Sequence, residues 1–266
     1  MSRRFILSGS LIIGILIILA LFAPLLSPYD PNKIDVENIL SPPSKAHILG
    51  TDSLGRDLLS RILYGTRVSL KVGVVAVGIA LLIGVAIGAL AGYCSGRIDA
   101  LLMRFVDIML CFPTFFLLLS MVAFLRPTVF NIMLIIGLTS WMGVARIVRA
   151  EVLSIKEREF IRYIKAMGAG DMRIVSKHIL PNVLPSILVV GILRMGGAIL
   201  TESALSFLGL GVQPPIPSWG SILMEGKSVM DIAWWMSVFP GIAILLTVLG
   251  YNLLAEGIRT LAISRS

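Results

Sequence analysis

Charge is scarce in this sequence of 266 residues, because Asp, Glu, Lys and Arg make up 14% of it. Soluble domains usually carry about 25% charged residues. Cysteine and histidine are scarcer still, with two residues of each. The low charge excludes an ordinary soluble domain, and the shortage of Cys and His argues against a disulfide framework and against a zinc site.

Two sequence motifs, one for nucleotide binding and one for metal binding, are also missing. The sequence contains no Gly-x-x-x-x-Gly-Lys-Ser/Thr loop, so it cannot hydrolyse ATP by that route, and no His-Glu-x-x-His metal motif. An intramembrane enzyme would need a nucleophile with a base, or a metal, at membrane depth. His47 and His178 lie outside the apolar runs, and Ser203 and Ser206 have no histidine near them in the sequence to act as a base. We therefore expect a protein that is not an enzyme, with no metal and no cofactor.

Long apolar runs account for most of what is present, since 57% of the residues are hydrophobic. A helix needs about 20 residues to cross the hydrocarbon core of a bilayer. Runs that approach or exceed this length predict six transmembrane helices at residues 5–26, 72–96, 108–125, 127–145, 184–208 and 232–255. The expected fold class is an all-α polytopic membrane protein, divided into an N-terminal span with an outer segment (1–71) and a five-helix core (72–266).

Lys and Arg predict the orientation of these helices. With both termini in the cytoplasm, fourteen of the 23 Lys and Arg residues, including Arg3 and Arg265, lie inside and eight lie outside. Cytoplasmic loops carry the excess of positive charge in membrane proteins, so this orientation is favoured. Cys94 and Cys111 then lie near the reducing side, where a disulfide is not expected. The first run is too long for a typical signal peptide and lacks a cleavage site, so we expect it to remain as a helix.

Four glycines recur every fourth residue in the second run, at Gly84, Gly88, Gly92 and Gly96. This spacing lines one helix face with backbone and allows another helix to approach closely. Glycine is also generally frequent in membrane helices. The pattern therefore predicts tight packing of this helix and nothing more specific.

The outer segment before the second run is expected to contain a short amphipathic helix. Asp52 and Arg56, and likewise Asp57 and Arg61, are spaced for helical ion pairs. The apolar residues of the same stretch, Leu54, Leu58 and Ile62, fall on one helical face. Two interpretations remain open: a helix at the membrane surface that faces a partner with its arginines, or a solvated helix that only leads into the next span.

The stretch from Arg146 to Pro181 is basic and lies between apolar runs. Residues 159–167 have apolar positions at helical spacing, and Gly168 is suited to end a helix in the left-handed conformation. Asp171 is suited to cap a second short helix that Pro181 would close. This pattern predicts a rigid helix-turn-helix on the cytoplasmic side. An ordinary positive-inside loop would explain the charges but not the ordered breaks.

Arg194 and Glu202 interrupt the fifth apolar run. A charge in hydrocarbon costs at least about 2.5–3.5 kcal/mol, so each must face protein, water or a partner. Either the two residues line a polar pathway, or Glu202 lies near the outer end of the helix and contacts solvent or a second subunit. Ionisable residues at membrane depth also leave an ATP-independent transporter open as an alternative.

Several segments resemble a known family. Gly168, Leu180 and Pro181 match the loop motif of binding-protein-dependent ABC importer permeases, in which Glu-Ala-Ala is followed after three residues by Gly and after nine more by Ile-x-Leu-Pro. The sequence departs from the motif at 162–164, which read Arg-Tyr-Ile, and at His178. Further segments resemble the second permease of peptide/nickel importers: HILGTDSLGRD (47–57), Ser60-Arg61, GTRVSL (65–70), REF (158–160), HILPN (178–182), SFLGLG (206–211) and SWG (218–220).

This resemblance, which extends from the outer segment to the last outer loop, implies a type I ABC importer permease fold in a prokaryotic inner membrane. It implies a complex with a homologous second permease, two ATP-binding subunits and an extracytoplasmic substrate-binding protein. The cargo would be a dipeptide or oligopeptide, with nickel or another small solute as the alternative. The sequence does not identify the cargo, because the binding protein selects it. The resemblance assigns contact with the ATPase to Glu159, Arg162, Ala166, Gly168, Ala169 and Asp171.

Overall fold

The protein folds into helices joined by short connections. A computed structural model describes residues 2–126 and 128–263, and this part of the chain contains no β-strand, only one isolated bridge between Thr51 and Asp57. Within these described residues, five helices are long and apolar enough to span a membrane, and a sixth span results if one bent helix pair is counted as one. The expected all-α polytopic class is confirmed.

The chain forms two compact units, which are described separately. The first comprises the described residues of Met1–Val75, Phe124–Met133 and Ile192–Ser266, and the second comprises Ala76–Ala123 and Leu134–Gly191. These units are defined by their compactness, whereas the expected boundary at residue 71 separates the N-terminal span and outer segment from a five-helix core. That boundary stays a prediction.

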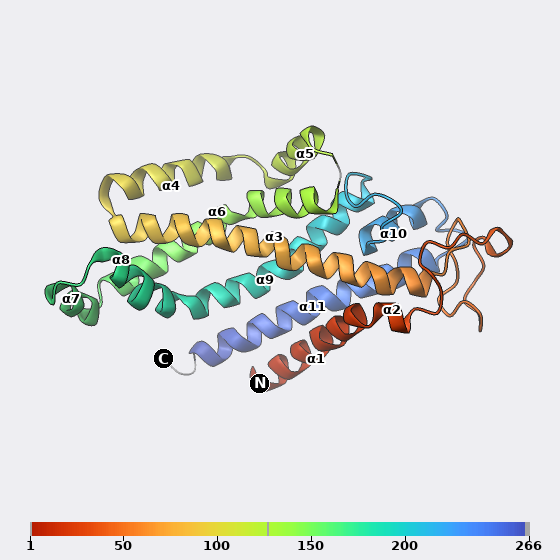
Figure 1. Ribbon diagram of the computed structural model, residues 1–266, viewed down its shortest axis with the longest axis horizontal. Coiled ribbons are helices and arrows are strands. Elements are labelled where there is room, and N and C mark those ends of the chain that lie inside the picture. Colours follow the sequence, from red (N-terminus) through yellow and green to blue (C-terminus); the bar gives the residue numbers. More distant parts are fainter. Residues whose placement is uncertain (1, 127, 264–266) are drawn as a thin grey trace. The chain divides into compact units, whose positions relative to one another are not determined.

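The first unit is built around two long helices at the ends of the chain, α1 (Ser2–Leu21) and α11 (Trp235–Ile263), which lie side by side (Figure 1). They pack antiparallel through glycine. A Cβ on Gly9 would lie 2.6 Å from the backbone nitrogen of Leu254, and a Cβ on Gly250 would lie 2.9 Å from the Ile12 side chain. Because the helices are antiparallel, the start of α1 and the end of α11 lie on the same side of this unit, as an even number of spans requires.

Shorter elements complete the first unit. They are α2 (Ala23–Leu26), the 3₁₀ turn η1 (Val36–Asn38) and α10 (Trp219–Lys227). Ser218 caps α10: its hydroxyl accepts a hydrogen bond from the backbone N–H of Ser221, whose own hydroxyl accepts one from the backbone N–H of Ser218. This reciprocal arrangement fixes the start of α10. The helix lies against α11 in the same unit.

The second unit shows why the glycine repeat is present. It contains the C-terminal part of α3 (Leu58–Cys94) and most of α6 (Val129–Lys156). Cβ atoms on Gly84, Gly88 and Gly92 would each lie within 3 Å of α6 atoms. The predicted close packing is confirmed for these three. Gly96 is different, because it follows α3 at φ +60° with open space around it and serves the turn into α4.

The third expected span, 108–125, is wrong as a single straight helix. Instead α4 (Gly96–Cys111) and α5 (Thr114–Phe124) meet at a bend of 84°. Pro113 lies in the break, where it cannot donate the backbone hydrogen bond that a continuous helix requires. Cys94 ends α3 and Cys111 ends α4, and both are exposed free thiols.

A proline that was expected to end a helix does not do so. The helices α8 (Asp171–Ile174) and α9 (Leu180–Phe207) are joined by the π-helical turn η2 (Val175–Ile179), and the whole stretch is one candidate span. Pro181 lies in the first turn of α9 and Pro185 lies inside it. A π-helical turn lets the helix continue with an altered hydrogen-bond ladder. The expected fourth span began at Pro127, which lies outside the described residues.

Candidate functional site

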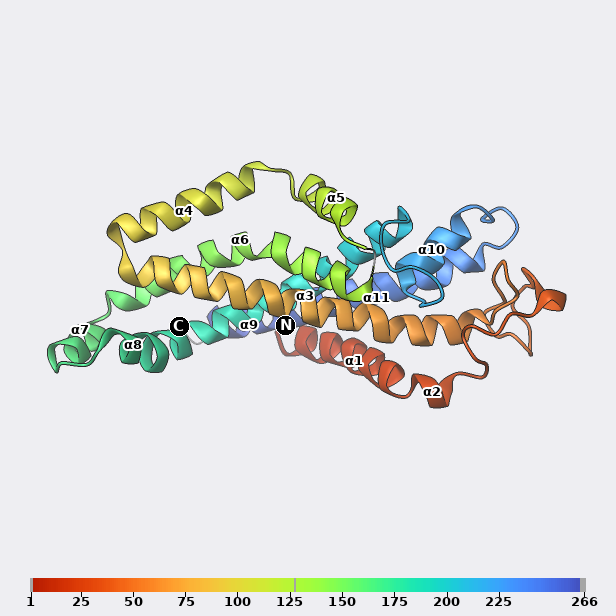
Figure 2. The same cartoon turned by 45° about the horizontal axis from the view of Figure 1, so that its top comes forward.

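The segment between α6 and α9 forms the predicted helix-turn-helix at one end of the second unit (Figures 1 and 2). Its first helix, α7 (Glu159–Ala166), ends at a turn in which Gly168 has φ +83° and donates a backbone hydrogen bond to the Lys165 carbonyl. Only glycine adopts this backbone conformation readily. Gly170, and not Asp171 as expected, is the N-cap of α8, because Asp171 is already its first helical residue.

Apolar side chains anchor this segment to the unit beneath it. Ile161 of α7 and Ile174 of α8 are buried in a core with Val152 and Ile155 of α6. Ala169 of the turn packs partly buried against the same core. Burying such side chains contributes about 1.5–3 kcal/mol each. The turn is therefore held firmly against α6 and the α8–α9 helix.

The opposite face of the segment is exposed and partly apolar. Glu159, Arg162, Ala166 and Gly168 are exposed, as a contact surface for a partner requires. Tyr163 and Met167 are 70% and 72% exposed and extend that surface. The sequence alone assigns neither residue to the contact surface, because the spacing of apolar residues does not show which of them face outward. Arg162 pairs with Glu157 at 2.6 Å, an exposed ion pair that contributes little to stability.

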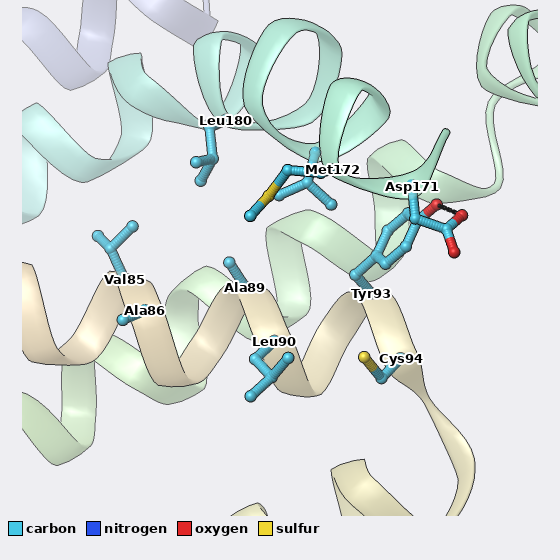
Figure 3. A pocket seen from close by; sticks show the side chains of 10 residues that line it. Val85, Ala86, Ala89, Leu90, Tyr93, Cys94, Asp171, Met172 and Leu180 are labelled. Atoms are coloured by element: carbon cyan, nitrogen blue, oxygen red, sulfur yellow. Dashed lines mark hydrogen bonds between the residues drawn. The ribbon is translucent and has the colours of Figure 1, made fainter. Parts of the chain in front are cut away.

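Asp171 is tied to α3 by a residue that the sequence did not indicate. The Tyr93 hydroxyl donates to the Asp171 carboxylate at 2.5 Å (Figure 3). The Tyr93 carbonyl accepts a hydrogen bond from Lys156 Nζ at 2.6 Å. Tyr93 thus connects α3 to the end of α6 and the start of α8. Next to it, α3 and the α8–α9 helix enclose an apolar groove of about 460 Å³, with Ala89 and Met172 on opposite walls.

The outer segment of the first unit holds a buried ionic cluster. Asp52 accepts from Arg56 Nε at 2.7 Å and from Arg61 at 2.9 Å, and Glu225 of α10 accepts from the same two arginines at 2.9 and 2.8 Å. The expected Asp52–Arg56 pair is present. Glu225 was not predicted, and its distance along the chain leaves no local signal.

Three expectations for this segment are wrong. The expected helix at residues 52–62 does not form as such, because α3 begins at Leu58 after a turn closed by the Thr51–Asp57 bridge. Arg56 and Arg61 are 5% and 1% exposed and do not face solvent. Asp57 does not pair with Arg61. Two carboxylates attract both arginines inward, and burial then requires that each charge be paired.

Burial raises the pKa of Glu225 to about 7. The neighbouring Asp52 carboxylate acts in the same direction, while the Arg56 guanidinium acts against it. Desolvation disfavours the charged form of a carboxyl group, and here it outweighs the arginine. Burial in this cluster thus favours the protonated form of Glu225.

Asp57 lies between a histidine and a serine. It accepts from the Ser60 hydroxyl at 2.7 Å, and its other oxygen lies 2.9 Å from His47 Nδ1. In a hydrolytic triad the histidine lies between the serine and the carboxylate, so that it can take the serine proton. The order here is different, and the three residues brace the connection into α3. Among residues 2–126 and 128–263, no group of His, Cys, Asp and Glu has the arrangement of a metal site.

Glu202 is buried within the first unit in a cage of serine hydroxyls. Its Oε1 accepts from Ser206 at 2.7 Å and from Ser218 at 2.8 Å. Its Oε2 lies 3.4 Å from the hydroxyls of Ser69 and Ser203. These bonds connect α9 to α3 and to the cap of α10. Arg194 lies before Glu202 on the same helix, α9, and is half-buried. Lining of a transport pathway by either residue stays a prediction.

Comparison with known proteins places the chain among transport proteins. Residues 84–265 match the family described as binding-protein-dependent transport system inner membrane component, and residues 2–43 match the N-terminal TM domain of oligopeptide transport permease C. These matches define a class: permease subunits of ABC importers, which are translocation subunits and not enzymes. The chain belongs to the family of binding-protein-dependent transport system inner membrane components.

Similar proteins carry names of peptide-type systems. The chain is 42% identical over 263 residues to the glutathione transport system permease protein GsiD of Pectobacterium atrosepticum, covering 97% of this chain and 87% of that protein. It is 43% identical over 258 residues to the dipeptide transport system permease protein DppC of Alkalihalophilus pseudofirmus, with coverage of 97% and 85%. It is 41% identical over 254 residues to the probable D,D-dipeptide transport system permease protein DdpC of Escherichia coli, with coverage of 96% and 85%.

Among solved structures, the inward-facing MetNI methionine ABC transporter has a chain of similar fold. The TM-score is 0.59 at 19% identity, over 76% of this chain and 97% of that chain. At this identity the similarity concerns the fold alone, and it confirms the expected type I importer permease fold.

Proposed function

We propose that this chain is one of two permease subunits of an ATP-driven importer for dipeptides or oligopeptides. The observation that carries the proposal is the similarity at 40–43% identity to permeases named for dipeptides, di/tripeptides and glutathione, over nearly the whole chain. Nickel or another small solute is the alternative cargo. In this proposal an extracytoplasmic binding protein delivers the cargo, and both termini of the chain lie in the cytoplasm.

The energy would come from two separate ATPase subunits, since the sequence lacks a phosphate-binding loop of its own. They would dock on the exposed face of α7 and its turn, at Glu159, Arg162, Ala166 and Gly168, with Ala169 and Asp171 at the border of the contact. Tyr163 and Met167 supply apolar contact area there. Because the buried side of the turn packs on α6, movement of the ATPase would move the spans as bodies.

We also assign a docking or gating role to the outer motif of Asp52, Arg56, Asp57 and Arg61. Two carboxylates hold each of the two arginines in place. The resulting rigidity of the segment supports a role as a platform for an external partner. The arginines themselves are too buried to be the main contacts.

The test is reconstitution of the purified complex. The chain is co-expressed with the permease, ATPase and binding-protein genes that neighbour its own, and the complex is placed in liposomes that contain ATP. We expect uptake of a labelled dipeptide or oligopeptide that requires both the binding protein and ATP hydrolysis. Uptake of labelled nickel in place of peptide would establish the alternative cargo, and accumulation without ATP would contradict an ATP-driven importer.

A further inference from the structure

A groove in the first unit has the chemistry of a lipid site. It lies between the C-terminal end of α1 and the first half of α3 and encloses about 290 Å³. On the α1 side its wall consists of Ile17, Ala20 and Leu21. Ile17 and Leu21 are 44% and 67% exposed, so the groove is open along its length to the surroundings of the two helices. Both helices qualify as membrane spans, which makes those surroundings the bilayer.

The α3 side of the groove combines apolar residues with two cations. Val74 and Val75 continue the apolar wall, while Arg67 and Lys71 lie one helical turn apart on the same face. Among the described residues, no acidic side chain lines the groove. The Arg67 guanidinium lies 5.9 Å from the centre of the Tyr64 ring, a contact that leaves its N–H donors available to a ligand.

These two cations differ from the arginines that precede them on the chain. Arg56 and Arg61 are each neutralised by Asp52 and Glu225. Among the ion pairs of residues 2–126 and 128–263, none includes Arg67 or Lys71. Cations at the edge of hydrocarbon are stabilised by an anion, and the phosphate of an anionic lipid headgroup is an anion that the bilayer itself supplies there.

We propose that this groove binds an anionic phospholipid, whose phosphate contacts Arg67 and Lys71 and whose acyl chain lies along Ile17 and Val74. The volume of about 290 Å³ supports a lipid chain over a protein helix, because a helix about 10–12 Å wide fills more than this volume in a single turn of about 5.4 Å. The apolar floor supports a lipid over free phosphate, which would need only the cations. The site is independent of the cargo of the importer, and it would fix α1 against α3 through a component of the membrane.

Native mass spectrometry of the detergent-solubilised complex tests this assignment. Phosphatidylglycerol, phosphatidylcholine and inorganic phosphate are titrated separately, so that headgroup charge and acyl chain are distinguished. We expect retention of phosphatidylglycerol in preference to phosphatidylcholine. In the double variant Arg67→Gln, Lys71→Gln we expect retention of phosphatidylglycerol to fall by about tenfold or more, from the loss of two cations. The matched control is Arg126→Gln, Lys45→Gln, which removes one arginine and one lysine that do not line the groove.

A second variant tests the groove without changing its charge. Val74→Trp fills the apolar channel, and we expect it to reduce lipid retention while Leu11→Trp, on exposed α1 surface outside the groove, does not. Each variant is first checked for an unchanged elution volume and thermal midpoint. Wild-type retention in the double variant or in Val74→Trp, or equal retention of the two lipids, overturns the proposal. Displacement of the lipid by inorganic phosphate also overturns it, because the cations alone would then be the site.

Discussion

At the scale of single residues, Gly88 shows how tightly α3 packs on α6. A Cβ there would lie 2.5 Å from the Ala145 carbonyl oxygen, whereas a Cβ on Gly78 of the same helix would meet no atom within 4 Å. We expect Gly88→Ala to destabilise the protein by about 1–3 kcal/mol, because the two backbones must separate. Gly78→Ala is the matched control and should be neutral or stabilising by up to about 1 kcal/mol. Thermal unfolding in detergent measures both, and equal midpoints would contradict the packing argument.

Glu225 gives the stability of the first unit a dependence on pH. Its pKa is raised from 4.5 to about 7 in the folded protein, so between these values the folded chain binds more protons than the unfolded chain. The contribution of this group to the free energy of unfolding is therefore largest at acidic pH and decreases as the pH rises to about 7.

The experiment compares wild type with Glu225→Gln, whose side chain does not ionise. We expect the thermal midpoint of wild type, relative to that of the variant, to be higher at pH 5 than at pH 7.5. Parallel pH profiles of the two proteins would show that the carboxyl group of Glu225 titrates normally.

The outer motif shows what residue spacing can and cannot predict. Spacing predicted the Asp52–Arg56 contact correctly, because both residues lie in one tight turn. It failed for Asp57 and Arg61, because Asp57 bonds to His47 and Arg61 bonds to Asp52 and Glu225. An i,i+4 spacing indicates a contact only where the chain is helical, and at residues 52–57 it is not.

At the scale of elements, the turn between α7 and α8 depends on the backbone of Gly168. Its φ of +83° costs a residue with a Cβ about 1–2 kcal/mol, although no neighbouring atom blocks a side chain there. Proline at 168 is worse, since its φ stays near −65° and the hydrogen bond to the Lys165 carbonyl is lost. We expect Gly168→Pro to insert normally and to lose ATPase binding or coupling, with Gly168→Ala impaired less.

Gly170→Ala is the control for this turn. Gly170 has φ −70° and open space around its Cα, so alanine fits without strain. Co-purification of the ATPase subunits and substrate-stimulated ATP hydrolysis are the measurements. Full coupling in Gly168→Pro would exclude this turn as the transmission element, and loss of coupling in Gly170→Ala would show that the effect is not conformational.

Prolines had different consequences in different elements. Pro113 coincides with the 84° bend between α4 and α5. Pro181 and Pro185 lie within one continuous stretch from Asp171 to Phe207. At Pro181 the π-helical turn η2 rearranges the hydrogen-bond ladder just before the proline, so the helix continues. Pro185 lies inside α9, where a proline removes one backbone hydrogen bond without ending this helix. Sequence alone does not reveal which of these outcomes a proline will have.

At the scale of the whole molecule, the proposed orientation is open to direct labelling. Single cysteines at Ser44 and Ser228 are expected on the outer side and at Ser154 on the cytoplasmic side, and all three serines are exposed. Cys94 and Cys111 are exposed free thiols and must first be replaced by alanine. In intact cells an impermeant thiol reagent should label positions 44 and 228, and label position 154 only after lysis. The reverse pattern would invert the orientation; Arg265, expected inside, lies outside the described residues.

The sequence by itself determined the membrane class, most of the spans, the close packing at Gly84, Gly88 and Gly92, and the turn at Gly168. These features follow from local properties: the length of apolar runs, a four-residue period, and the conformational freedom of glycine. Only the tertiary structure decided which polar groups meet. Arg61 and Glu225 are 164 residues apart, and Ser69 and Glu202 are 133 apart. Such pairs form because polar and charged groups that folding removes from water need hydrogen-bond or ion-pair partners, and distant segments supply these partners only when they come together.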